Sequence, residues 1–383
     1  MAAHALLSAS SSERWMNCTP SARLNEKQKD VTSVYAELGT MAHEMGELLL
    51  RIFVGGHDMA DIATFEDAMQ VFQKSELYYE GMIEDVEAYV DYVKEQYNEA
   101  LEKTKDAKIF LEERLDYSSY VPEGFGTGDC IIIADGEMEI IDLKFGTEVE
   151  VSPVDNPQLK LYALGAYEKY GFIYGIEKIT MTIAQVRLNN ISSSSITADM
   201  LTEWAEKEVI PAAEKAYKGK GDLRPGPWCG FCKVRNTCKA RTNMYKGFHP
   251  PKDPNVMNNE ELAEVLAIVD DLAKWAKEIK EYSLEIALKG EKIPGFKLVE
   301  GRSNRQITDS DALASLLMEN GYSEDKIYKP KTLEGITNLE KVVGKKNFTK
   351  LAGEFITKPP GKPTLTTEDD KRPAMDSAED DFF

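Results

Sequence analysis

The sequence predicts an α/β fold in which helices cover a mixed β-sheet, and three observations lead to this class. Two apolar, β-branched runs flank Asp135-Gly136, a dipeptide typical of tight β-hairpins. Helical periodicity lies on both sides of this hairpin, in residues 39–50, 75–103, 156–164 and 197–217. Two further strands are expected, at residues 108–115 and 178–187. The order helix, strand, hairpin, helix, strand and helix suits a layered α/β core.

The first expected helix, residues 39–50, presents polar side chains on one face. His43 and Glu47 lie four residues apart and therefore share that face. A helix packed against the hairpin would add the imidazole of His43 to a metal site. The alternative is a structural role for His43.

The next two elements are expected to build the core. Residues 75–103 have an apolar stripe opposite an acidic face, which predicts a helix that covers the sheet. Glu113 belongs to the strand expected at residues 108–115. Its two interpretations are a salt bridge on that strand and an approach to the metal site.

The hairpin carries polar residues at the ends of its strands. Asp129 is expected to open the first strand and Asp142 to close the second. In an antiparallel pair these ends lie side by side, so the two carboxylates can converge on one hard cation. Lys144 shares the face of Asp142, where it would orient a water molecule or stabilise charge on a phosphate. The alternative is ordinary exposed charge.

The helix after the hairpin is expected to begin near Pro157, which suits a first helical turn. Gln158 and Tyr162 are four residues apart and present an amide and a phenol on one face. These groups can hold a substrate backbone, whereas Tyr162 alone is typical of a core residue.

Taken in order, these residues resemble the RecB/AddB-type branch of the PD-(D/E)XK nucleases, a branch that includes CRISPR-associated exonucleases and many phage proteins. The pattern of that branch is G-x-x-x-H, G-x-x-D, D-x-K and Q-x-x-x-Y. Its motifs match Gly39 to His43, Gly126 to Asp129, Asp142 to Lys144, and Gln158 to Tyr162.

The resemblance implies a restriction-endonuclease-like α/β/α core and a metal-dependent DNA nuclease. It implies that His43, Asp129 and Asp142 bind Mg²⁺ or Mn²⁺, with the carbonyl of Leu143 completing the site. It also implies that Lys144 assists the attacking water, and that Gln158 and Tyr162 lie on the helix that faces DNA.

Four cysteines form a second motif. Cys229, Cys232 and Cys238 have the spacing C-x2-C-x5-C, and Cys18 stands alone near the N-terminus. In the branch named above, one early and three late cysteines often bind a 4Fe-4S cluster that brackets the nuclease core. Zn²⁺ is the alternative, because spacing alone does not separate the two. Disulfides fit less well, since cysteine is sparse and we expect no secretory signal, and Cys130 is expected to pack inside its strand.

The composition bears on partners. The 383 residues carry a formal net charge of −20, which opposes long-range attraction to DNA. A local basic strip near the site would resolve this conflict, although the same residues can be ordinary solvated charge. The strip would comprise Arg114, Lys144, Lys160, Arg187, Lys233, Arg235, Lys239 and Arg241. No apolar run is long enough to span a bilayer, so we expect a soluble protein without a membrane partner.

The expected domain organisation has four parts. Residues 1–245 form the nuclease-like domain with its cluster-binding segment, and residues 246–258 form a proline-rich linker. Residues 259–356 form a small C-terminal α+β unit, in which Arg302, Asn304 and Arg305 lie on a basic loop. Residues 357–383 form a disordered acidic tail that ends on two phenylalanines.

The tail resembles those of bacterial single-strand DNA-binding proteins, which dock on replication and repair partners. It would recruit such a partner or mask a basic surface, and the alternative is a solubilising end. The sequence as a whole predicts a DNA exonuclease of phage or prophage type, active in replication or recombination in the bacterial cytoplasm. The alternatives are a non-catalytic DNA-binding accessory protein and a zinc-stabilised scaffold.

Overall fold

The structure is a computed structural model that describes residues 5–29, 33–55, 59–147, 149–246, 258–299, 309–320 and 322–328, and parts of 333–356. The chain divides into two compact units, residues 1–304 and 305–383. The basic loop around residues 302–305, most of the expected linker and the acidic tail lie outside the described residues.

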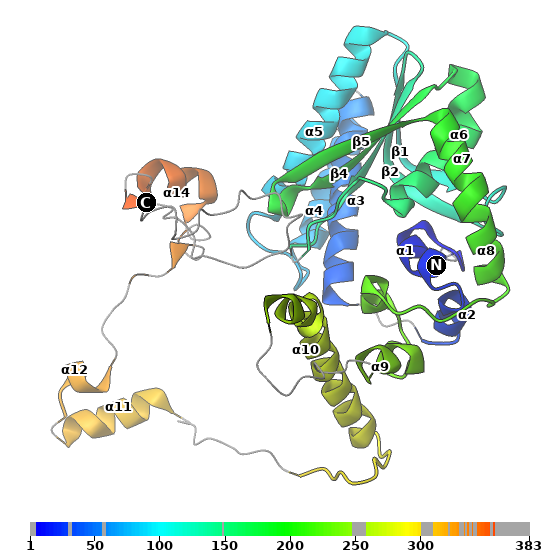
Figure 1. Cartoon of the computed structure of the whole chain (residues 1–383). Helices are drawn as coiled ribbons and strands as arrows, with labels where there is room; N and C mark the ends of the chain where they lie inside the picture. Colours follow the sequence, from blue (N-terminus) through cyan, green and yellow to red (C-terminus); the bar gives the residue numbers. More distant parts are fainter. Residues whose placement is uncertain are drawn as a thin grey trace, which may run out of the picture. The chain divides into compact units, whose positions relative to one another are not determined.

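A five-stranded mixed sheet forms the centre of the first unit (Figure 1). The strands follow one another in space in chain order, and only β3 and β4 are parallel. Their bounds are β1 (Lys108–Asp116), β2 (Phe125–Ala134), β3 (Glu137–Leu143), β4 (Lys178–Gln185) and β5 (Asn190–Thr197). A parallel pair needs a crossover connection, which α6 (Pro157–Tyr174) supplies between β3 and β4.

Helices cover both faces of this sheet, which confirms the predicted α/β class (Figure 1). One face packs against α3 (Val34–Gly55) and α5 (Met82–Lys103), and α4 (Met59–Phe72) packs against α3. The other face packs against α6, together with α1 (Ser12–Asn17), α7 (Ala198–Trp204) and α8 (Ile210–Tyr217). The short helix α2 (Ser21–Glu26) contacts α1 and α8.

Two apolar layers hold the helices to the sheet, because side chains alternate between the faces of each strand. The layer beneath α6 contains Leu115, Ile131, Ile140, Leu161 and Ile183. The layer beneath α3 and α5 contains Met45, Val86, Cys130, Ile132 and Ile141. Cys130 is fully buried, as expected of a small apolar residue within a strand.

Two local predictions near the site are confirmed. Asp135 and Gly136 both have positive φ, 50° and 76°, which is the backbone that a tight type I′ hairpin requires. Helix α6 begins at Pro157, and the side chain of Asn156 caps it by accepting hydrogen bonds from the N–H groups of Gln158 and Leu159. This cap fixes where Gln158 stands relative to the sheet.

Other boundaries differ from the sequence prediction. The helix expected from residue 75 begins at Met82, after Gly81 with φ of 97°. The helix expected over residues 197–217 is α7 and α8 joined by one π-helical segment, Ala205–Val209. The edge strand β5 was not predicted, because its four consecutive serines lack the β-branched, apolar character of a strand. Residues 295–299, expected to be a strand, have no regular structure.

The remaining helices lie at and after the cysteine motif. They are α9 (Lys239–Lys246), α10 (Asn259–Leu288), α11 (Ser310–Glu319), α12 (Glu324–Ile327) and α14 (Lys345–Ala352). Glu278 of α10 forms an ion pair with Arg241 of α9 at 2.6 Å, so α10 belongs to the first compact unit rather than to the expected C-terminal unit. Within the described residues, no helix combines the length and apolar character needed to cross a membrane.

Candidate active site

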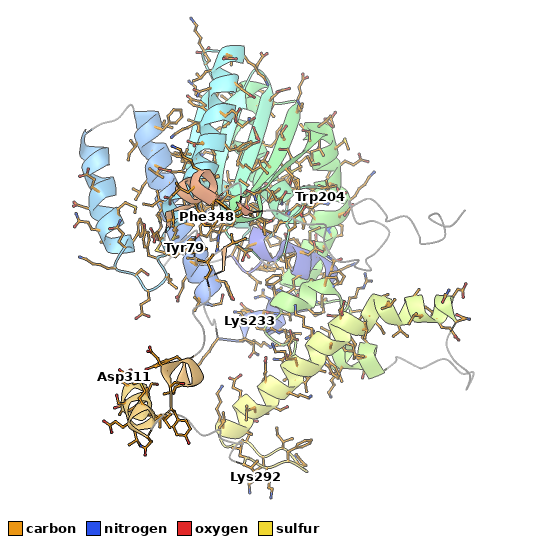
Figure 2. The ribbon with its side chains drawn as sticks, turned by 90° about the vertical axis from the view of Figure 1, so that its left-hand side faces the viewer. Tyr79, Trp204, Lys233, Lys292, Asp311 and Phe348 are labelled. Carbon is orange, nitrogen blue, oxygen red and sulfur yellow. The ribbon has the colours of Figure 1, made fainter. Side chains whose placement is uncertain are left out.

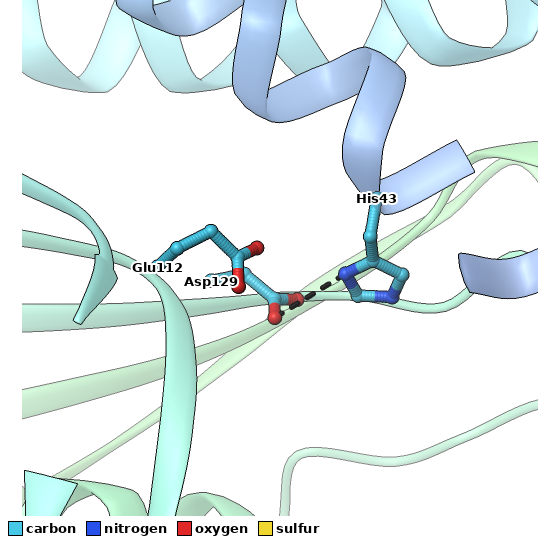
Figure 3. A group of neighbouring side chains, drawn as sticks. All are labelled: His43, Glu112 and Asp129. Carbon is cyan, nitrogen blue, oxygen red and sulfur yellow. Dashed lines mark ion pairs between the residues drawn. The ribbon is translucent and has the colours of Figure 1, made fainter. Parts of the chain in front are cut away.

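Three potential metal ligands meet above one face of the sheet (Figure 3). His43 comes from α3, Glu112 from β1 and Asp129 from β2, and one ligand atom from each lies within 4.8 Å of the others. His43 Nδ1 is 3.3 Å from Asp129 Oδ1. In an octahedral site with bonds of about 2.1 Å, ligand atoms stand about 3.0 to 4.2 Å apart. The separation of His43 Nδ1 and Asp129 Oδ1 falls within this range.

Glu112 joins this group because the alternation of β1 shifts by one residue. Leu111 packs in the layer beneath α5, whereas Leu115, which has the same parity, packs in the layer beneath α6. Glu112 lies between them with φ of 48°, a conformation that non-glycine residues rarely adopt. Glu113 consequently forms an ion pair with Lys169 of α6. The prediction that Glu113 forms a salt bridge is therefore confirmed. Glu112, rather than Glu113, lies with the potential metal ligands His43 and Asp129.

Two glycines of β2 leave room for neighbouring side chains, one from α6 and one from β1. A Cβ atom at Gly126 would stand 2.7 Å from the ring of Tyr162, and one at Gly128 would stand 2.9 Å from Leu115 Cδ1. Glycine is therefore required at Gly126 for Tyr162 to lie where it does. By contrast, a Cβ atom at Gly39 would meet nothing within 4 Å.

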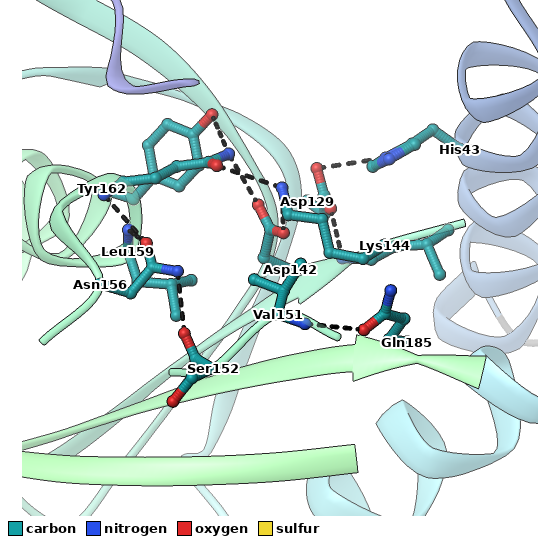
Figure 4. A network of polar contacts seen from close by, with 12 residues as sticks. His43, Asp129, Asp142, Lys144, Val151, Ser152, Asn156, Leu159, Tyr162 and Gln185 are labelled. Carbon is teal, nitrogen blue, oxygen red and sulfur yellow. Dashed lines mark hydrogen bonds and ion pairs between the residues drawn. The ribbon is translucent and has the colours of Figure 1, made fainter. Parts of the chain in front are cut away.

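A second polar group lies at the end of β3, on the side of α6 (Figure 4). Lys144 Nζ is 2.7 Å from Asp142 Oδ2 and donates a hydrogen bond of 3.1 Å to Gln158 Oε1. Gln158 Nε2 is 3.2 Å from Asp142 Oδ1 and 3.3 Å from the Tyr162 hydroxyl. Only one orientation of the Gln158 amide suits these partners, because its oxygen faces the ammonium and its nitrogen faces the carboxylate.

The two groups are joined through the backbone of β3. Asp129 Oδ2 accepts a hydrogen bond of 2.7 Å from the N–H of Leu143, which ties the middle of β2 to the end of β3 (Figure 4). The prediction that Asp129 opens its strand is wrong, because β2 begins four residues earlier, at Phe125. Asp142 is 3% exposed, and its Oδ2 accepts no hydrogen bond with good geometry despite its ion pair with Lys144. A buried carboxylate oxygen with spare acceptor capacity suits a bound cation.

The ionisable groups show that this site attracts positive charge. Burial lowers the pKa of His43, but the neighbouring carboxylates, Asp129 foremost, together have the larger, opposite effect. The pKa of His43 is therefore raised to about 9. Burial, followed by the charge of Asp129, raises the pKa of Glu112 to about 7. Burial also raises the pKa of Asp142, while Lys144 opposes this effect. In the absence of a cation, retained protons offset the gathered negative charge.

Several expected site residues have other partners. Glu47 forms an ion pair with Arg51 at 2.6 Å, one turn further along α3. Arg187 is 3.6 Å from Asp85, and its guanidinium carbon lies 5.2 Å from the centre of the ring of Tyr79. Figure 2 labels this tyrosine. Five members of the expected basic strip are ion-paired: Lys144 with Asp142, Lys160 with Asp155, Arg187 with Asp85, and both Arg235 and Arg241 with Glu278.

The four motif cysteines line one cavity, which they share with Arg14 and Trp228. All four are free thiols. The cavity is bounded by the segment after α1 and by the short helix Pro227–Phe231 with the turns that follow it. The N–H of Gly226 donates to Cys229 Sγ at 3.5 Å, and Asn25 Nδ2 donates to Cys232 Sγ at 3.3 Å. No pattern in the sequence selects Asn25, because its partner is 207 residues away.

The fold and these two sites define an α/β protein with a candidate metal-ligand group at the sheet and a separate cavity lined by four cysteines. The chain belongs to the family described as "Protein of unknown function (DUF2800)", whose model matches residues 4–373. One solved structure, described as "Crystal structure of SSO0001", is 14% identical over 60% of this chain and 96% of that chain, with a TM-score of 0.23. That score is too low to relate the two folds.

Proposed function

We propose that the chain is a metal-dependent DNA nuclease of the PD-(D/E)XK type, and that it acts as an exonuclease. One observation carries the proposal: the buried carboxylate of Asp142 is paired with Lys144 next to the His43, Glu112 and Asp129 group. The resemblance in motif order supports the same activity. The proposed setting is phage DNA replication or recombination.

The residues at the sheet fit a divalent cation on chemical grounds. Their ligand atoms are carboxylate oxygens and one imidazole nitrogen, which suit Mn²⁺ and Mg²⁺. Asp142, a ligand in the sequence prediction, is not among the three residues whose ligand atoms lie within 4.8 Å of one another, and we propose that its carboxylate joins them when a cation binds. When bound, such a cation polarises a phosphate and lowers the pKa of a bound water.

The surrounding side chains would position the reacting groups. Lys144 donates a hydrogen bond to Gln158 and forms an ion pair with the Asp142 carboxylate. Its side chain is 26% exposed, so the ammonium group has protons left for a water molecule or a phosphate oxygen. Gln158, which also contacts the Tyr162 hydroxyl, donates to the Asp142 carboxylate and holds it in one orientation, which keeps the ammonium at a fixed position relative to the strand end.

For the cysteine cavity we propose a 4Fe-4S cluster rather than zinc. Four thiolates on one zinc ion, with bonds of about 2.3 Å, have sulfur atoms about 3.8 Å apart. No three sulfurs among Cys18, Cys229, Cys232 and Cys238, all of which the structure describes, lie within 4.8 Å of one another. A cluster binds each cysteine to a separate iron, so the wider spacing in a common cavity favours it.

The experiment uses full-length protein purified without oxygen, with end-labelled linear DNA and closed circular DNA as substrates. The variant Asp142→Asn keeps an oxygen that can accept from Gln158 but removes the charge. A matched control is Glu139→Gln, three residues earlier on β3, where Thr182 and Tyr92 donate to the carboxylate away from the site.

We expect Mn²⁺-dependent loss of linear DNA by the wild type and by Glu139→Gln, and none by Asp142→Asn. Intact circular DNA would identify the activity as that of an exonuclease. Iron-loaded protein that binds DNA but digests neither substrate would contradict the nuclease proposal and would favour an accessory role.

A further inference from the structure

The cysteine cavity joins two parts of the chain that are about two hundred residues apart, and hydrogen bonds already connect them. Thr19 Oγ1 donates to the carbonyl of Lys220 at 2.6 Å. Arg23 Nε donates to the carbonyl of Tyr217 at 2.7 Å. Asn25 of α2 reaches the cysteine motif itself. The protein chain thus holds Cys18 near the other three cysteines through contacts that need no metal.

Asn25 differs from Thr19 and Arg23 because it contacts the sulfur of one of the four motif cysteines directly. Its side chain is 5% exposed, and Nδ2 donates to the carbonyl of Ser21 at 2.7 Å as well as to Cys232 Sγ at 3.3 Å. Its Oδ1 accepts a hydrogen bond of 2.7 Å from the N–H of Lys233. The amide is therefore fixed in one orientation, with its N–H group directed at the sulfur.

A second donor to a cysteine sulfur, Gly226, uses its backbone N–H, which no substitution other than proline removes. Among the residues that the structure describes, Asn25 is the side chain that donates to one of the four sulfurs. A buried polar side chain with every group satisfied is costly to change. Because Asn25 donates from its side chain, a substitution can remove this one N–H···S hydrogen bond, and its effect on the cysteine site can be measured.

We propose that Asn25 is a positioning residue of the four-cysteine site. Its side chain holds Cys232 in place as a ligand and raises the reduction potential of the bound cluster. This inference rests on the cluster assigned under the proposed function. A hydrogen bond to a ligand sulfur stabilises negative charge on that sulfur, and the reduced cluster carries more negative charge than the oxidised one. Loss of the bond therefore shifts the potential to lower values.

The test compares wild type, Asn25→Leu and Thr19→Val as full-length proteins purified without oxygen. Leucine matches the shape of asparagine but donates nothing, and Thr19→Val removes a contact between the same two segments without touching a sulfur. The measurements are iron content per chain, the rate of cluster loss to a chelator, and the potential of the iron-loaded fraction. Asn25→Ser provides a smaller change if Asn25→Leu does not fold.

We expect a lower potential and faster cluster loss for the Asn25 variants, and a wild-type potential for Thr19→Val. Equal shifts in both kinds of variant would indicate a structural role only and would overturn the proposal. If the wild type contains iron and Asn25→Leu has the same potential and the same rate of cluster loss, the role of Asn25 is overturned. The proposal that the cysteines bind a cluster is then unaffected. A wild type without iron would overturn the cluster itself, and this inference with it.

Discussion

Gly126→Ala is the substitution whose effect follows most directly from the packing around one backbone position. The new Cβ atom would stand 2.7 Å from Tyr162 Cε1. Carbon atoms in contact prefer about 3.5 to 4.0 Å, so the tyrosine ring must retreat by about 1 Å. The Tyr162 hydroxyl is already 3.3 Å from Gln158 Nε2, and a retreat of that size breaks this hydrogen bond. Gln158 would then lose one of the contacts that fix its amide.

The expected cost has two parts. A displacement of about 1 Å in a positioning group reduces the rate about 10²-fold, and overpacking at this contact destabilises the fold by about 1 to 3 kcal/mol. The assays are the rate of Mn²⁺-dependent DNA hydrolysis and unfolding in urea. Gly39→Ala is the matched control, since its Cβ would meet nothing within 4 Å and alanine favours a helix. A Gly126→Ala protein with wild-type rate and stability would refute the reasoning.

Three further predictions concern the ligands and the lysine. Lys144→Ala should reduce hydrolysis by about 10²-fold or more while Mn²⁺ binding remains, because it removes one preorganised positive charge; kinetics at saturating Mn²⁺ would show this, and an unchanged rate would remove the role of Lys144. Glu112→Gln should weaken Mn²⁺ binding, measured by calorimetry, at least about 10-fold. Glu113→Gln should not weaken it, since Glu113 is paired with Lys169. Equal effects of the two substitutions would contradict the shifted alternation of β1. Mn²⁺ affinity should increase with pH up to about 9. The cation must displace one proton from His43, whose pKa is about 9, and one from Glu112, whose pKa is about 7. An affinity that does not change between pH 6 and pH 9 would exclude these two residues as ligands.

Much of the fold follows from local sequence signals. Asp135-Gly136 predicts the hairpin because few other dipeptides accept two positive φ angles. The spacing of Gln158 and Tyr162, together with the cap at Asn156, predicts that both side chains lie on one face at the start of α6. The contact of Lys144 with Asp142 follows from the two-residue period of a strand.

The remaining features depend on contacts that a local pattern does not contain. Glu112 reaches the ligand group only because its positive φ reverses the alternation of β1, and a two-residue period favours Glu113 instead. β5 has no apolar pattern, because it is an edge strand whose serines pair with threonines of β4. Asn25 is one asparagine among many until the fold brings it to Cys232.

The most direct test of the nuclease proposal is the rate at which iron-loaded protein releases nucleotides from linear DNA with Mn²⁺, measured for wild type, Asp142→Asn and Glu139→Gln. The account predicts metal-dependent release by the wild type and by Glu139→Gln, and loss of release in Asp142→Asn. Equal rates for all three proteins, or no release by a wild type that binds both Mn²⁺ and DNA, would contradict it.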